Sequence, residues 1–198
     1  PCEYFPPMQN DDRITAAFRY AQRLGHREGF SPVLVAVDNT LWEHFQQQFL
    51  KISELSDEHG FPLDEVASYR KKLLKSPVND GEMVLKALAH SRRGKGSEEV
   101  DWESLRSDDL DGGESNDQFL GYWDNSTGKT LPLLLAEIPV KNPWEIFAYL
   151  PFGGWNRCPD TRDLMAISKY WIEKYGTVPA FLSHDVLEFI LPASVPEE

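Results

Sequence analysis

Cysteine and long apolar runs are both scarce in this chain. Its 198 residues contain two cysteines, Cys2 and Cys158, which are too few for a disulfide framework. The longest apolar runs, such as residues 132–136, are far shorter than the about 18 residues of a membrane-spanning helix. A hydrophobic content of 41% still allows a core. We therefore expect a soluble globular protein with no membrane contact, and a cytoplasmic location because no leader-like segment opens the chain.

Basic residues are also in short supply. Lysine and arginine number 20 against 32 aspartates and glutamates, which gives a formal net charge of −12. A nucleic-acid partner is excluded, because binding to phosphates requires a basic face. An acidic surface suits a basic protein partner, although net negative charge also serves solubility alone. Residues 98–124 hold ten of the acidic residues against the single Arg106, and residues 94–117 predict an acidic, flexible insertion.

The sequence contains no pattern that specifies a metal or cofactor. Its five histidines lack the His-x-x-x-His spacing of a metal site, and no Cys-x-x-Cys accompanies them. Residues 107–118 imitate part of a calcium loop, but Gln118 stands where a bidentate glutamate belongs. Gly121 and Gly128 have six residues between them, so the spacing of a phosphate-binding loop is also missing. We expect neither a metal nor a cofactor.

The pattern of apolar residues predicts an α+β fold. Helical spacing in the first half indicates helices over residues 12–24, 40–52, 63–74 and 81–90, with a stop at Gly25 and a cap at Thr40. Residues 33–37 form a β-branched run typical of a strand buried on both faces.

The second half predicts a mostly antiparallel sheet with one packed helix. The expected strands are 120–123, 131–140, 145–150, 178–182 and 186–191, and the expected helix runs from 161 to 175 with Asp160 as its cap. Composition divides the chain into a region 1–118, which carries the insertion, and a region 119–198, unless the two form one joint domain.

Residues 151–159 are the most distinctive stretch of the chain. Their sequence, Pro-Phe-Gly-Gly-Trp-Asn-Arg-Cys-Pro, predicts a shaped loop because it suits neither a regular strand nor a helix. Together with Asn142-Pro143-Trp144-Glu145 before it, and with Trp171, Tyr175-Gly176 and Asp185-Val186-Leu187-Glu188 after it, the stretch resembles a bacterial family known as domain of unknown function (DUF) 4253. The resemblance covers about residues 131–191.

The resemblance implies a role but no chemistry. The family has no established catalytic residues, and its members occur near immunity proteins of bacterial toxin systems, which implies an immunity-type or partner-binding role. Its members continue into an alanine- and glutamate-rich helix and a second Cys-Pro-Asp motif. This chain ends at Pro196-Glu197-Glu198, so we expect that it lacks that helix.

Two sets of residues are candidates for a site. Indole rings, amides and a guanidinium can line a binding pocket, although the same side chains can also serve the core and the loop. These candidate binding residues are Asn142, Trp144, Trp155, Asn156 and Arg157. Cys158 precedes a predicted helix, whose N-terminus can lower a thiol pKa, and His184 with Asp185 could supply a base and its orienter. A small buried cysteine is the alternative.

We expect a non-catalytic protein-binding module whose partner is basic, for example an immunity-type protein that binds a basic toxin. The alternative is a cysteine-dependent enzyme that uses Cys158 with His184. The sequence leaves the oligomeric state open.

Overall fold

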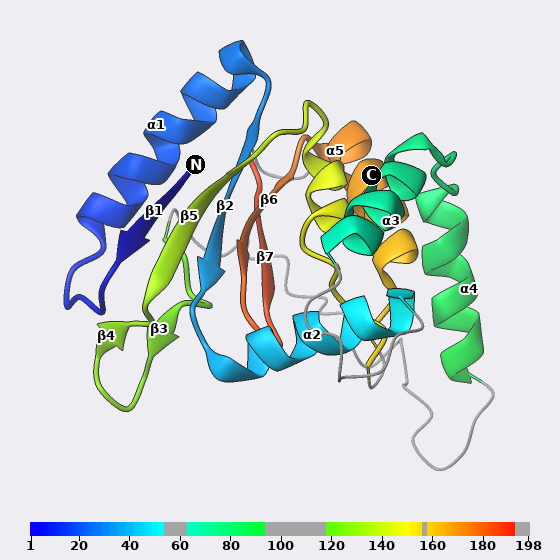
Figure 1. The fold of residues 1–198 in the computed structure, drawn as a ribbon. Coiled ribbons are helices and arrows are strands. Elements are labelled where there is room, and N and C mark those ends of the chain that lie inside the picture. The colour runs from blue at the N-terminus through cyan, green and yellow to red at the C-terminus, as the bar shows by residue number, and fades with distance from the viewer. Residues whose placement is uncertain (54–62, 94–117, 156–157, 193–198) are drawn as a thin grey trace.

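The computed structural model describes residues 1–53, 63–93, 118–155 and 158–192. Figure 1 shows strands in the middle of the molecule, with helix α1 on one side and the other helices on the opposite side. The acidic insertion predicted over residues 94–117 lies outside the described residues. In chain order the elements are β1 (Cys2–Phe5), α1 (Asp12–Glu28), β2 (Ser31–Ala36), α2 (Asn39–Ser53), α3 (Leu63–Lys75), α4 (Gly81–Arg93), β3 (Trp123–Asp124), β4 (Lys129–Thr130), β5 (Leu133–Ile138), the 3₁₀ helix η2 (Pro143–Ala148), α5 (Thr161–Tyr175), β6 (Val178–Leu182) and β7 (Leu187–Ile190).

The main sheet has five strands in the order β1-β5-β2-β6-β7. Strand β5 is antiparallel to both β1 and β2, and β6 is antiparallel to β7, while β2 and β6 are parallel. The class is α+β with a mostly antiparallel sheet, as the sequence predicts. Strand β2 comes from the first half of the chain and lies between two strands of the second half, so both halves build one sheet.

Strand β2 is the centre of the core because its side chains alternate between two hydrophobic clusters. Leu34 and Ala36 point to the face covered by α1, where Phe18 and Phe181 are also buried. Val33 and Val35 point to the opposite face, where residues of α2, η2 and α5 complete the core. This two-sided burial explains the β-branched run, which a strand with one solvated face would not need.

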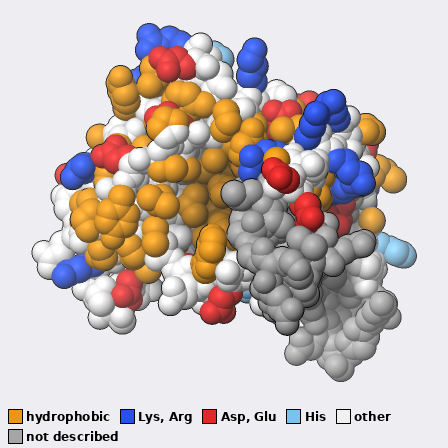
Figure 2. Space-filling view, in the orientation of Figure 1, with side chains coloured by type: hydrophobic (Ala, Val, Ile, Leu, Met, Phe, Trp, Pro, Cys, Tyr) orange, Lys and Arg blue, Asp and Glu red, His pale blue; other side chains and the backbone are white. Residues whose placement is uncertain are grey.

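The face of the sheet opposite α1 is covered by other elements only in part. Tyr4, Leu134 and Val35 are neighbours across β1, β5 and β2 on this face. Tyr4 is 54% exposed, Leu134 is half-buried and Val35 is 8% exposed, so cover increases from the sheet edge towards its centre. Figure 2 shows hydrophobic side chains gathered over this part of the sheet.

Several predicted boundaries need correction. Helix α1 continues past Gly25 and ends at Gly29, whose φ of 82° makes it the left-handed cap. Helix α2 begins at Asn39, and the Asp38 carboxylate, rather than Thr40, accepts from the backbone N–H of Leu41 at 2.7 Å.

The strand predicted over residues 145–150 is wrong. These residues fall largely in η2, which Asn142 and Glu145 begin with a capping box and which has a proline in its first turn. Of the predicted strand 120–123, only Trp123 is in a strand, β3, while the backbone N–H groups of Leu120 and Gly121 donate to the Glu188 carboxylate of β7. Helix α5 is confirmed, including Asp160, whose carboxylate accepts from the backbone N–H groups of Arg162 and Asp163.

Candidate functional site

The described residues of the 151–159 loop, 151–155 and 158–159, are held in place by hydrogen bonds. Gly153 and Gly154 both have positive φ, at 87° and 77°. The Gln48 amide of α2 donates to the Gly153 carbonyl at 2.7 Å, and the Thr161 hydroxyl of α5 donates to the Phe152 carbonyl at 3.0 Å. Side chains of two helices, α2 and α5, therefore both bond to the loop.

The tryptophans predicted to line a pocket are half-buried and pack against the core. The ring of Trp155 lies 4.8 Å from that of Phe152 and 4.4 Å from the His44 imidazole, measured between centroids. Trp144 belongs to η2, and the Lys169 ammonium lies 5.8 Å from its ring centroid. Much of the surface of both indoles is thus already used within the protein.

The remaining predicted binding residues divide into two cases. The Asn142 amide donates to the Glu145 carboxylate at 3.1 Å, which ties it to the start of η2. Asn156 and Arg157 lie outside the described residues. Among the described residues, no hydrogen bond joins Asn142 to Trp144 or Trp155.

The predicted catalytic residues are brought together only in part. His184 Nε2 lies 3.6 Å from an Asp185 carboxylate oxygen. Within the described part of the chain, no hydrogen bond links Cys158 to His184. Cys158 is half-buried among apolar side chains, and this burial raises the pKa of its thiol. A raised thiol pKa is the opposite of the activation that a nucleophile needs.

His184 has a second carboxylate neighbour that sequence reasoning missed. Its Nδ1 lies 3.6 Å from Asp38 Oδ2, a buried oxygen with no hydrogen-bond partner in the structure. Asp38 is the second residue after β2, and His184 is the second residue after β6. These strands are parallel neighbours, so their carboxyl ends meet at one edge of the sheet, where α/β folds commonly place polar ligand contacts. The position of Asp38 after a buried strand was the available sequence signal.

The same edge carries exposed apolar side chains. Val37 continues β2 on the partly covered face and is 44% exposed, and Trp42, one turn into α2, is 52% exposed. Asp185 is the most open of the three polar residues here, with 65% of its side chain exposed. Trp42 could not be identified from the sequence, because helical spacing alone does not show whether a residue outside the apolar stripe borders other apolar groups.

The described residues provide no group of three or more histidine, cysteine or acidic side chains that could hold a metal ion. None of the helices in this part of the chain has the length and apolar character needed to cross a membrane.

The C-terminal third of the chain is similar to a known family. Residues 134–198 match the family model described as Domain of unknown function (DUF4253). The matched range contains all of β5 except Leu133, together with the 151–159 loop, α5, β6 and β7, but neither β2 nor Asp38. No curated protein and no solved structure matches the chain at a significant level. The DUF4253 match therefore concerns one part of the sheet and carries no activity.

Thiol alkylation tests the cysteine-dependent alternative. In a Cys2→Ser variant, we expect Cys158 to react slowly at neutral pH and to gain reactivity only above the ordinary thiol pKa of about 8.5, since burial raises its pKa. The measurement is the alkylation rate against pH by mass spectrometry, with denatured protein as the fully reactive control. Fast labelling with a midpoint below that pKa would support an enzyme.

Proposed function

We propose that the protein is a non-catalytic, cytoplasmic binding module for a basic protein. The observation that supports it most is the surface formed by Tyr4, Leu134, Val37 and Trp42, which we call the apolar face. Three of these are large hydrophobic side chains exposed by 44–54%. Contiguous exposed apolar groups on one face are typical of interaction sites.

The apolar face is arranged like the centre of a protein interface. Tyr4 and Leu134 are direct partners across β1 and β5, and the Val37 backbone N–H donates at 2.8 Å to the carbonyl of Pro132, the residue before β5. Trp42 is placed by the first turns of α2, where its N–H bonds to the Asp38 carbonyl. Aromatic side chains on rigid elements make strong anchors because little conformational entropy is lost on binding.

Charge favours a basic partner. Asp38 and Asp185 lie at the end of β2 and β6, and Glu43 is exposed beside Trp42 on α2. The whole chain has a net charge of −12, which would attract a positively charged protein and raise its association rate. Salt screens this attraction, so association would be slower at high salt. An immunity-type role, in which the partner is a basic toxin, is one form of this proposal.

A display library of random peptides, selected on the immobilised protein, tests the proposal. We expect the selected peptides to be rich in lysine and arginine and to contain apolar anchors. Replacing Trp42 with alanine should then lower the affinity for the best peptide by about tenfold or more, which is the effect of removing an aromatic interface anchor. Tyr20→Ala is the matched control, because Tyr20 is an aromatic of α1 with 59% exposure outside the apolar face.

Selection of neutral or acidic peptides would contradict the basic partner. An equal loss of affinity in the Trp42 and Tyr20 variants would contradict the apolar face as the site. Thermal unfolding of both variants should match that of the unmodified protein, because each removed side chain is more than half exposed.

A further inference from the structure

A cavity of about 620 Å³ lies at the opposite end of β2 from Asp38. It is formed where the C-terminus of α1, the start of β2, the turn after β5 and the start of β6 meet. This volume falls within the range of about 300–1,000 Å³ typical of small-molecule sites. Its lining includes Arg27, Phe30, Lys141, Pro143 and Val178.

The walls of the cavity are held in place by several independent contacts. The carbonyl of Gly25 accepts from the backbone N–H groups of both Gly29 and Phe30, at 2.7 and 3.1 Å, which fixes the turn that carries the Phe30 ring. A Cβ on Gly25 would lie 2.4 Å from the Phe30 carbonyl, so this turn packs directly on the helix. The Ser31 hydroxyl donates to the Val140 carbonyl at 3.2 Å and joins the start of β2 to the turn after β5. A cavity with fixed walls loses little entropy when it binds a ligand.

The charges at the cavity differ from those of the rest of the chain. Arg27 and Lys141 come from different elements, and neither forms an ion pair or hydrogen bond through its side chain with another described residue. The stem of Lys141 passes over Gly29, with its Cε 3.6 Å from where a Cβ would stand, so this stem lies beside the C-terminus of α1. Glu28 is the single carboxylate among the described lining residues, so one net positive charge remains in a chain of net charge −12.

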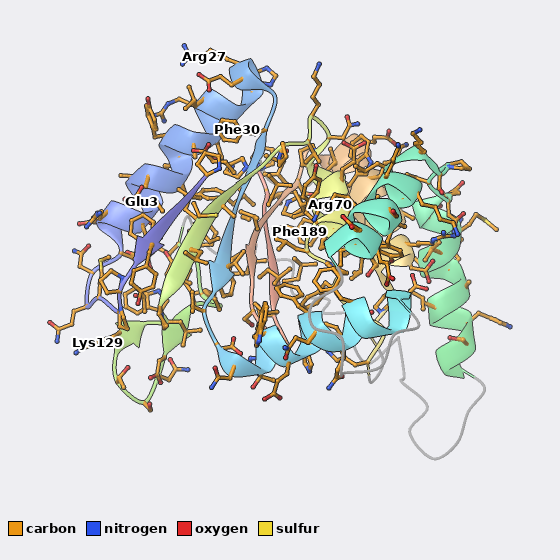
Figure 3. All side chains as sticks on the ribbon, viewed as in Figure 1. Glu3, Arg27, Phe30, Arg70, Lys129 and Phe189 are labelled. Atoms are coloured by element: carbon orange, nitrogen blue, oxygen red, sulfur yellow. The ribbon has the colours of Figure 1, made fainter. Side chains whose placement is uncertain are left out.

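The floor of the cavity is mainly apolar. Figure 3 shows Arg27 at the end of α1 and Phe30 below it, near the start of β2. Proline and valine side chains from η2 and β6 belong to the same lining as Phe30. Apolar walls with a few convergent charged groups at the rim suit a ligand with an apolar body and one charged end. Arg27 and Lys141, which pair with no other described side chain, favour a negative charge at that end.

We propose that this cavity binds a small organic carboxylate with an aromatic or aliphatic body. The carboxylate pairs with Lys141 and Arg27, and the apolar body lies against Phe30, Pro143 and Val178. This site is separate from the apolar face and does not depend on the proposed protein partner.

Phenylacetate and phenylacetamide provide a matched pair of probes, since they differ in the charged group. Binding is measured on the whole protein by the shifts of the backbone amide resonances of Gly29, Phe30 and Val178. We expect phenylacetate to saturate these shifts at millimolar concentrations and phenylacetamide to bind about tenfold more weakly, the difference that one charge-assisted hydrogen bond makes.

Variants locate the charge that recognises the carboxylate. Lys141→Gln should lower the affinity for phenylacetate by about tenfold and leave the affinity for phenylacetamide unchanged. Lys129→Gln is the matched control, because Lys129 is an exposed lysine of β4 outside the cavity, and it should bind both probes as the unmodified protein does. Equal binding of the two probes, absence of shifts at these three amides, or the same loss in both lysine variants would overturn the proposal.

Discussion

Replacing Gly153 with alanine is expected to lower the free energy of unfolding by about 3–5 kcal/mol. Two costs add. The φ of 87° is one that a residue with a Cβ adopts only with strain, which costs about 1–3 kcal/mol. The new Cβ would also stand 1.8 Å from the Pro159 carbonyl oxygen, a backbone atom that accepts from the Gly154 N–H. The loop must therefore open, and its contacts with α2 and α5 weaken with it.

Gly128→Ala separates the two costs. Gly128 also has a positive φ, of 64°, but no atom lies within 4 Å of the position of its Cβ. Its substitution should cost about 1–2 kcal/mol, which is the backbone strain alone. Chemical denaturation of both variants measures the difference. Equal losses would mean that the 151–159 loop rearranges freely and is not held as the structure shows.

Replacing Phe181 with alanine should cost a similar 3–5 kcal/mol, through loss of burial and creation of a cavity. Phe181 is 0% exposed in the middle of the sheet, and its ring makes an edge contact with Tyr122 at 5.7 Å between centroids. Tyr122 continues through Phe119 to Phe18 of α1 in a chain of ring contacts. The substitution removes one end of this chain and so loosens α1 as well as the sheet.

Phe189→Ala is the control for this second substitution. Phe189 lies on the neighbouring edge strand β7, is half-buried, and contacts Trp171 at 5.3 Å. Its loss should cost about 1–2 kcal/mol, in proportion to the smaller buried area. Denaturation curves give both values, and hydrogen exchange of α1 amides reports whether the helix loosens. If both variants lost the same stability, Phe181 would have no special place in the core.

The helices were largely predictable because their determinants are local. The apolar stripe of α5, its cap at Asp160 and its stop at Gly176 are adjacent in the sequence, and all three are present in the structure. The segment 145–150 misled the prediction because its apolar residues also suit a strand. The capping box of Asn142 and Glu145 and the proline at position 143 favour the helix η2 instead. These local signals outweigh the strand preference of a short apolar run.

The order of the strands could not be predicted, so the residues that the fold brings together could not be predicted either. Nothing local indicates that β2 pairs with β6, yet that pairing places Asp38 beside His184. The composition of residues 151–159 predicted a loop rather than a strand or helix, and the described residues of this stretch are in neither. Its contacts with Gln48 and His44 depend on where α2 lies, which only tertiary structure shows. Trp42 was missed for the same reason.

The central place of β2 also affects the order in which the chain can fold. Strand β2 can pair with β5 only after the whole middle of the chain has been synthesised, and it can pair with β6 later still. These pairings have large sequence separations, so closing them is slow compared with forming the helices. During synthesis, β2 therefore lacks both neighbours until β5 has emerged, and it lacks one of them until residue 182 has emerged, which leaves an apolar strand prone to misassembly.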